Sequence, residues 1–188
     1  MNMLKKQFYL FALLSAVLVS ILSSSCKRQA AVRETVKAMT DCTLSFPLSL
    51  NIINADQIED RDQLSYGGKM KLVMYVPPEA CSTCRISKFY ITDTLFRLTP
   101  PAELVPMVIV QPSKEKRDSI VQAIRNAWFE FPVYEDPAGE FMHVNPAIPS
   151  GDGRFHTFLV DESNHITLIG DPTLDPRVLE LYIKTLSK

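Results

Sequence analysis

The run LVMYV-PPEA-CSTC at residues 72–84 decides the fold. Residues 72–76 are apolar and rich in strand-forming types, two prolines then break the strand, and apolar residues at helical spacing begin at Ile86. Cys81 and Cys84 therefore stand at a turn from a strand into a helix. Free backbone N–H groups and the positive end of the helix dipole stabilise a thiolate at such a turn, and two cysteines at this spacing can close a small disulfide ring. The sequence therefore predicts a redox site.

The N-terminal residues resemble a bacterial lipoprotein signal. Lys5 and Lys6 are basic, residues 8–22 are apolar apart from two serines, and three further serines lead to Cys26. An apolar core of about 15 residues is short for a membrane span. We expect residues 1–25 to be a lipoprotein signal peptide and Cys26 to become the lipidated first residue of the mature chain; an ordinary cleaved signal or an uncleaved anchor is the alternative. Each of these places the domain outside the cytoplasm, and the lipid anchor predicts a membrane protein of the cell envelope that faces the periplasm or the cell surface.

The other three cysteines are interpreted in that oxidising setting. Disulfides persist outside the cytoplasm, which favours a redox-active or oxidised Cys81–Cys84 pair over a zinc site. A zinc ribbon would need a second ligand pair, and the sequence has no second CxxC and no closely spaced pair of histidines. Cys42 is expected to be a small buried apolar residue, with a resolving or intermolecular role as the alternative.

Length and composition fit one ordinary domain behind a short spacer. Removing residues 1–25 leaves 163 of the 188 residues and changes the net charge from −1 to −3, since two lysines and no acids are lost. Residues 26–41 are polar and predict a lipid-anchored tether, and residues 42–188 predict the folded domain. The scattered basic residues exclude a nucleic-acid partner, and the 46% apolar content is ample for a core.

Strand and helix patterns alternate along the second half of the chain. Pro106 suggests that its strand lies at an edge or pairs late, whereas Asp175 and Pro176 form a clear helix start. The alternation predicts an α/β fold, a mixed sheet with helices on both faces, in which right-handed crossovers place the first helices on one side. Residues 136–153 predict an irregular connection, and Phe89, Trp128, Phe158 and Tyr182 are expected in the core. The expected strands are 72–76, 104–110, 131–134, 155–160 and 166–169, and the expected helices are 84–98, 113–128 and 176–186.

These features together resemble the thioredoxin-like superfamily over residues 66–188. The CxxC follows a central strand and starts a helix, and a hairpin and a terminal helix end the chain. Four segments are similar to thioredoxin-like lipoproteins of Bacteroidetes, of the membrane-anchored thiol-disulfide oxidoreductase type: TFLVD at 157–161, Cys84-Arg85, Asp171-Pro172 and Leu181-Tyr182.

The resemblance implies thiol–disulfide exchange with protein thiols or disulfides and no cofactor. It makes Cys81 the exposed nucleophile and Cys84 the buried resolving thiol. The mechanism requires a lowered pKa of the Cys81 thiol. The charge of Arg85 would help to lower this pKa if its guanidinium lies over the turn. The alternative is that Arg85 is a solvated charge without such a role. A reductive role would also imply a membrane electron donor.

Three positions depart from the family pattern. Ala80 replaces the tryptophan before the first cysteine, and Tyr75, a poor base near neutral pH, replaces the buried acid of thioredoxin. His156 stands where a cis-proline normally precedes Thr157. A non-proline cis bond costs about 3 kcal/mol, so the bond at residue 156 is expected to be trans.

His156 has three possible roles. It could serve as the base or cationic partner of Cys81, or complete a Zn²⁺ or Cu(I) site with Cys81 and Cys84, or be an ordinary strand residue with a hydrogen bond at the sheet end. Glu79 is an alternative proton acceptor. His143 and His165 fall in predicted loops or turns and receive no role.

The sequence therefore predicts a lipid-anchored extracytoplasmic thiol-disulfide oxidoreductase that uses Cys81 and Cys84. A non-catalytic thioredoxin-like lipoprotein scaffold with an inert disulfide is the main alternative. A thiol-based metal carrier or a thiol peroxidase is a further one, although Pro78 stands where a peroxiredoxin has a threonine.

Overall fold

The computed structural model describes residues 27–54, 66–92, 95, 104–112, 117–127 and 131–187. The chain divides into two units, residues 1–38 and residues 39–188. Residues 27–40 are helical, so the predicted tether has regular structure over this part. The predicted signal peptide, Cys26, the predicted helix start at Ser113 and Trp128 lie outside the described residues. Within the described ranges, no helix combines the length and apolarity needed to cross a membrane.

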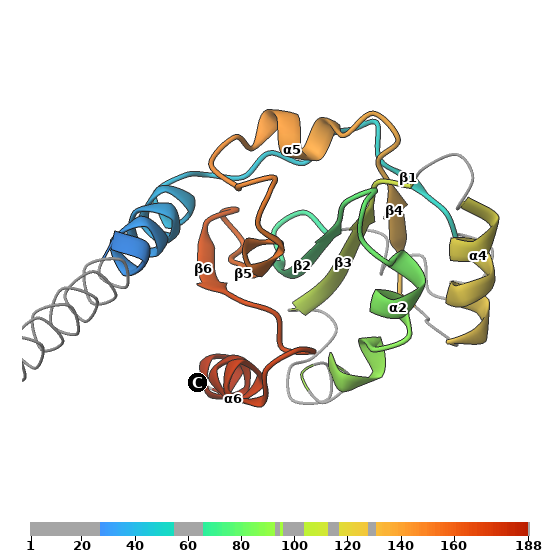
Figure 1. Cartoon of the computed structure of the whole chain (residues 1–188). Coiled ribbons are helices and arrows are strands. Elements are labelled where there is room, and N and C mark those ends of the chain that lie inside the picture. Colours follow the sequence, from blue (N-terminus) through green and yellow to red (C-terminus); the bar gives the residue numbers. More distant parts are fainter. Residues whose placement is uncertain are drawn as a thin grey trace, which may run out of the picture. The chain divides into compact units, whose positions relative to one another are not determined.

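In the part of the chain that the structure describes, six strands form one mixed sheet (Figure 1). Their order across the sheet is β1-β4-β3-β2-β5-β6, with β2, β3 and β4 mutually parallel and the remaining neighbours antiparallel. The continuous apolar runs of β2 and β3 are typical of parallel strands buried on both faces. The strands are β1 Asn51–Ile52, β2 Met70–Val76, β3 Leu104–Val110, β4 Val133–Glu135, β5 Thr157–Val160 and β6 Ile166–Ile169.

Helices cover both faces of this sheet. Ile86 and Phe89, together with Ile120 and Ile124, pack on one face against a buried cluster that includes Met74 and Val110. The terminal helix packs on that same face, where Tyr182 joins Leu72, Leu104 and Leu159. Within the described part of residues 39–188, the helices are α2 Ser82–Ile86, α4 Arg117–Asn126, α5 Glu140–Val144 and α6 Pro176–Leu186, with 3-10 turns η3 Phe89–Thr92 and η5 Gly153–Phe155.

The opposite face is covered by α5 and the segment before β1. Phe141 of α5 is fully buried and stacks on Tyr75, with ring centroids 5.8 Å apart, and Phe46 packs on Phe141. Side chains of a strand alternate between faces, so Tyr75 points here while Met74 and Val76 point toward α2. The predicted mixed sheet with helices on both faces is confirmed, as is the placement of the first helices, α2 and α4, on one side.

Of the two positions that Pro106 suggested for its strand, the edge position was wrong, whereas late pairing holds on the side of β4. β3 lies between β2 and β4, and all seven of its residues are buried. Pro106 is in register with Leu72 of β2, whereas the pairing of β3 with β4 begins only at Val108. Gln111 donates to the Val76 carbonyl of β2, so by alternation along the strand the nitrogen of Pro106 faces the side of β4, before β4 begins, and its missing N–H removes no ladder hydrogen bond. A proline in such a run therefore does not by itself mark an edge.

The helix after the cysteines is shorter than predicted. α2 ends at Ile86, where the Ser87 hydroxyl donates to the Cys84 carbonyl at 3.0 Å, and the chain continues as η3. Serine and threonine hydroxyls compete with helical hydrogen bonds in this way. Within the connection predicted to be irregular, Asp136 accepts hydrogen bonds from the N–H groups of Glu140 and Phe141 and starts α5, which contains His143.

The C-terminal helix begins where the sequence predicted. Asp175 accepts a hydrogen bond from the Arg177 N–H at 2.9 Å, and Pro176 is the first helical residue. Phe89, Phe158 and Tyr182 are all buried, as expected for core residues. The two-residue strand β1 was not predicted.

Candidate functional site

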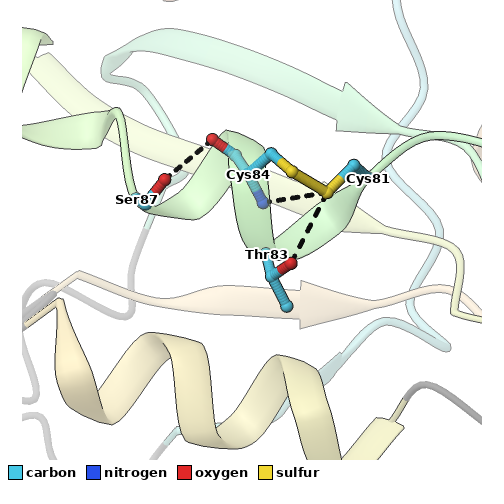
Figure 2. The surroundings of a disulfide bond; sticks show 4 residues. All are labelled: Cys81, Thr83, Cys84 and Ser87. Atoms are coloured by element: carbon cyan, nitrogen blue, oxygen red, sulfur yellow. Dashed lines mark hydrogen bonds between the residues drawn. A yellow bond between two sulfur atoms is a disulfide. The ribbon is translucent and has the colours of Figure 1, made fainter.

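The two cysteines form a disulfide at the start of α2 (Figure 2). Cys81 is the N-cap residue, in an extended conformation, and Cys84 lies in the first turn, with a Cα–Cα distance of 5.3 Å. The strand β2, the break at residues 77–80 and the helix start therefore stand in the predicted order. Pro77 is part of that break, since its carbonyl accepts the Ala80 N–H at 3.0 Å.

The sulfur of Cys81 receives the capping hydrogen bond of α2. The Cys84 N–H donates to Cys81 Sγ at 3.3 Å, and the Thr83 hydroxyl lies 3.5 Å from the same sulfur (Figure 2). A backbone donor held by a helix start favours negative charge on the atom that it faces. Cys81 is thus the sulfur that the local backbone is arranged to stabilise.

Both cysteines are exposed, so the prediction that Cys84 is buried was wrong. The buried residues of α2 are Ser82 and Ile86, which lie four positions apart and therefore on one helix face. Cys84 stands halfway between them in sequence and points away from that face. The helical phase that buries Ile86 turns both sulfurs outward.

A pocket of about 340 Å³ adjoins Cys81. The cysteine turn and helix α4 form its walls, so an incoming chain can reach the Cys81 sulfur beside a partly apolar surface. Glu79 lies at this pocket and is exposed, as expected for a solvated acid. The lining residues are Glu79, Ala80, Cys81, Ser82, Thr83, Ser119 and Ile120.

Arg85 fits neither of its predicted roles. Its guanidinium forms an ion pair with the carboxylate of Asp171, in the connection between β6 and α6, and donates from Nη2 to Thr157 Oγ1 at 3.2 Å. The Arg85 side chain is 18% exposed and the Asp171 side chain 4%. The charge is therefore largely withdrawn from solvent and directed into the sheet.

His156 is buried on the α5 face of the sheet. Its Nε2 lies 3.0 Å from the Pro149 carbonyl, to which it donates, and its ring meets Tyr75 edge-on at 5.5 Å. The described contacts of His156 include neither cysteine. Its peptide bond is trans, as expected. This arrangement matches the ordinary structural role among the three predicted for His156.

Tyr75 is neutral over the physiological range. Burial, followed by the charges of Asp136 and Glu79, raises the pKa of Tyr75 to about 12. Its hydroxyl donates to Gln111 Oε1. Tyr75 therefore cannot replace the proton-relaying acid of thioredoxin near neutral pH, as the sequence indicated.

The remaining candidate residues lie outside the cysteine site. Cys42 is a free, half-buried thiol that donates to the Met39 carbonyl at 3.1 Å, and burial raises its pKa. His165 lies in the turn between β5 and β6, with Nε2 3.0 Å from the Thr43 hydroxyl.

The described part of the chain holds no group of three or more His, Cys, Asp or Glu side chains that could bind a metal ion. The predicted alternative of Cys81, Cys84 and His156 as a metal site is not assembled.

No family model and no curated protein matches this chain, whereas several solved structures are similar to it. The thioredoxin domain of a thiol-disulfide oxidoreductase from Bacteroides vulgatus is 18% identical with a TM-score of 0.43, and the match covers 61% of this chain and 80% of that chain. A secreted thiol-disulfide isomerase from Corynebacterium glutamicum is 13% identical with a TM-score of 0.48, covering 65% and 74%. The exposed lipoprotein thioredoxin of Streptococcus pneumoniae is 16% identical with a TM-score of 0.44, covering 65% and 89%.

The topology itself carries the assignment of the fold. Strands β2, β3 and β4 are joined through α2 and α4, and the β5–β6 hairpin pairs antiparallel with β2 and leads into the terminal helix α6. The cysteine pair lies at the first strand-to-helix turn of this arrangement. The chain therefore has a thioredoxin-like fold with a CxxC pair, Cys81 and Cys84, at the start of the helix that follows its central strand.

Proposed function

We propose that this protein catalyses thiol–disulfide exchange with other proteins through Cys81 and Cys84. The observation that carries the proposal is the exposed disulfide at the start of α2, in which the Cys84 N–H donates to Cys81 Sγ at 3.3 Å. An accessible sulfur that receives a backbone hydrogen bond is suited to act as an attacking thiolate and as a leaving group. The pocket beside Cys81 offers room for the substrate chain.

The proposed reaction begins from the reduced pair. The Cys81 thiolate attacks one sulfur of a substrate disulfide, the bond between Cys81 and that sulfur forms, and the second substrate sulfur leaves as a thiolate and takes up a proton. The Cys84 thiolate then attacks Cys81 Sγ, closes the Cys81–Cys84 disulfide and releases the first substrate sulfur. Two electrons pass from the protein to the substrate, and the reverse sequence oxidises a substrate dithiol.

Insulin reduction with dithiothreitol as the electron donor tests this proposal. The full-length chain in detergent should accelerate the reaction, and Cys81→Ser should abolish the acceleration. Reduced Cys84→Ser, mixed with insulin after dithiothreitol has been removed, should retain a mixed disulfide on Cys81. Cys42→Ser is the matched control, because Cys42 is also a cysteine but has no contact with the pair. Equal rates for the wild type and Cys81→Ser would contradict catalysis.

A non-catalytic scaffold is the competing function, and one observation favours it. Tyr75 and His156, which occupy positions that matter in the thioredoxin pattern, are bound internally on the α5 face and are not directed at the sulfurs. A scaffold would keep its disulfide closed through the insulin assay. An active pair should instead show one thiol that reacts rapidly with iodoacetamide at mildly acidic pH, located by mass spectrometry.

We also propose that Cys26 anchors the chain to a membrane of the cell envelope. The polar helical segment 27–40 would then space the domain from the bilayer, and a reductive role would require a membrane electron donor. Labelling of growing cells with an alkynyl fatty acid tests the anchor. The wild type should incorporate the label and Cys26→Ser should not; labelling that persists in Cys26→Ser would contradict lipidation at this residue.

A further inference from the structure

We propose that Arg85 is a positioning residue that holds Cys84 within reach of Cys81 when the disulfide is open. Its ion pair with Asp171 and its hydrogen bond to Thr157 fasten the second half of the cysteine turn to the sheet. The inference rests on the proposed function, since it concerns how the same pair closes. It differs from the expectation that Arg85 acts on the thiolate through its charge.

The partners of Arg85 are themselves firmly held. Thr157 is fully buried at the start of β5 and is in register with Met74 of β2. Asp171 accepts the N–H and the hydroxyl of Thr173 through Oδ1, at 2.8 and 2.7 Å, while Oδ2 faces the guanidinium. A buried carboxylate paired in this way gives Arg85 a fixed point of attachment.

Helix α2 needs such an attachment because it is only five residues long. A helix of this length is not stable by itself in water, so contacts outside the helix must hold it. Ile86 supplies an apolar contact, being 1% exposed in the core, whereas both cysteines are exposed and contribute little packing. In the oxidised protein the disulfide also closes the turn. In the reduced protein that constraint is gone, and the anchoring depends more heavily on Arg85 and Ile86.

The same geometry argues against a direct action of the Arg85 charge on the sulfurs. The guanidinium is neutralised by an Asp171 carboxylate in contact with it, and its second contact is the Thr157 hydroxyl. Loosening the turn lowers the effective concentration of one thiol at the other. This favours the open dithiol and slows the attack of Cys84 on a mixed disulfide at Cys81.

The test is the equilibrium of the pair with glutathione, measured on the full-length chain in detergent. Protein dithiol and oxidised glutathione exchange to protein disulfide and two reduced glutathione molecules, and acid quenching with mass spectrometry resolves the pair from the free Cys42. We expect Arg85→Ala and Asp171→Asn to lower this equilibrium constant by about threefold or more and to increase the trapped mixed disulfide. Arg85→Lys should recover part of the loss, because it can meet Asp171 but cannot at the same time reach Thr157.

Two controls separate positioning from stability and from charge. Arg177→Ala removes an arginine–aspartate pair that is exposed on α6, with side-chain exposures of 88% and 35%, and should leave the equilibrium constant unchanged. The pH profile of Cys81 alkylation should be the same in Arg85→Ala as in the wild type. A purely structural role would destabilise the oxidised and reduced forms equally and leave the glutathione equilibrium unmoved.

An equilibrium constant unchanged in Arg85→Ala and Asp171→Asn would overturn the inference, and so would a shifted alkylation profile. If Arg85→Ala does not fold, Asp171→Asn decides the matter, since it is isosteric and keeps an oxygen for Thr173. The glutathione equilibrium can be measured even if insulin reduction is absent. Failure of this inference is therefore distinguishable from failure of the proposed function.

Discussion

The two faces of the sheet differ most where β2 ends. On the α2 face, Met74 and Val76 pack against Ile86 and support a short helix whose cysteines are exposed. On the α5 face, Tyr75 points into a closed cluster with Phe141 and His156. Alternation along a strand sends neighbouring residues to opposite faces, so a residue near the cysteines in sequence need not be near them in space.

Three polar side chains of the α5 face bind internally, whereas the buried Tyr134 hydroxyl has no hydrogen-bond partner among the described residues. The Tyr75 hydroxyl donates to Gln111, His156 donates to the Pro149 carbonyl, and Asp136 accepts two N–H groups of α5. Buried polar groups with partners stabilise a fold and are withdrawn from reaction with solutes. The comparison shows that a tyrosine, histidine or aspartate can take part in catalysis only where its side chain is not already bound within the fold.

The largest expected effect comes from truncating one large core side chain on each face. Phe141→Ala should destabilise the protein by about 3–5 kcal/mol and Ile86→Ala by about 2–5 kcal/mol, because each removes a fully buried side chain. Only Ile86→Ala should also change the alkylation rate of Cys81 in the folded protein, since Ile86 supports α2. Denaturant unfolding and timed alkylation measure the two effects. If Phe141→Ala altered the alkylation rate of Cys81 as much as Ile86→Ala does, the α5 face would also affect the cysteine site, contrary to this prediction.

Alkaline pH should weaken the α5 face next. Burial raises the pKa of both Tyr75 and Tyr134 to about 12, against 10 for exposed tyrosine. The folded state favours the neutral phenols, so their contribution to stability is complete below pH 10 and is lost as the pH rises through 12. On the other face of the sheet, burial also raises the pKa of Tyr182, a residue of α6. Unfolding should therefore set in between pH 10 and 12, measured by circular dichroism.

Tyr75→Phe isolates one of these groups. The variant keeps the ring that stacks on Phe141 and removes the hydroxyl that titrates. The midpoint of alkaline unfolding should move to higher pH, although the lost bond to Gln111 lowers stability near neutrality by about 1 kcal/mol. A midpoint that stays in place would show that Tyr75 does not contribute to the alkaline transition.

The smallest expected effect on activity belongs to His156. His156→Gln loses the ring contact with Tyr75 but keeps a side-chain donor for the Pro149 carbonyl, so we expect a stability loss of about 1 kcal/mol. The rate of insulin reduction and its pH dependence should stay within about twofold of the wild type. A tenfold loss of rate, or a displaced pH profile, would show that His156 takes part in the reaction and that the α5 face contributes to the cysteine site.

Local patterns in the sequence predicted much of this fold. The apolar run 104–110 matches β3 over its full length, and the Asp175-Pro176 pair marks the start of α6. Both signals are local: strand burial follows from consecutive apolar residues, and a cap depends on a side chain two residues from the N–H that it binds. The place of the cysteine pair at a strand-to-helix turn was predicted for the same reason.

The details that decide the chemistry depend on contacts far apart in the sequence. Arg85 contacts Asp171, 86 positions later, only because β5 pairs with β2 and β6 pairs with β5. The exposure of Cys84 follows from the burial of Ser82, a polar residue that no hydrophobic pattern marks. The direction of His156 is set by η5, which ends just before it. None of these long-range or polar arrangements is encoded in periodicity.

The way the chain enters the domain has a mechanical consequence. Thr43 bridges to His165, and the Leu44 N–H donates to the Asn164 carbonyl at 2.8 Å, so the entering segment is fastened to the turn between β5 and β6. Tension transmitted along the preceding residues would be borne first by this corner hairpin, whose outer strand β6 forms one edge of the sheet. Strand β2, which leads into the helix start with the disulfide, lies further in, beyond β5. Pulling on that end of the chain would therefore strain the hairpin before it could distort the reacting sulfurs.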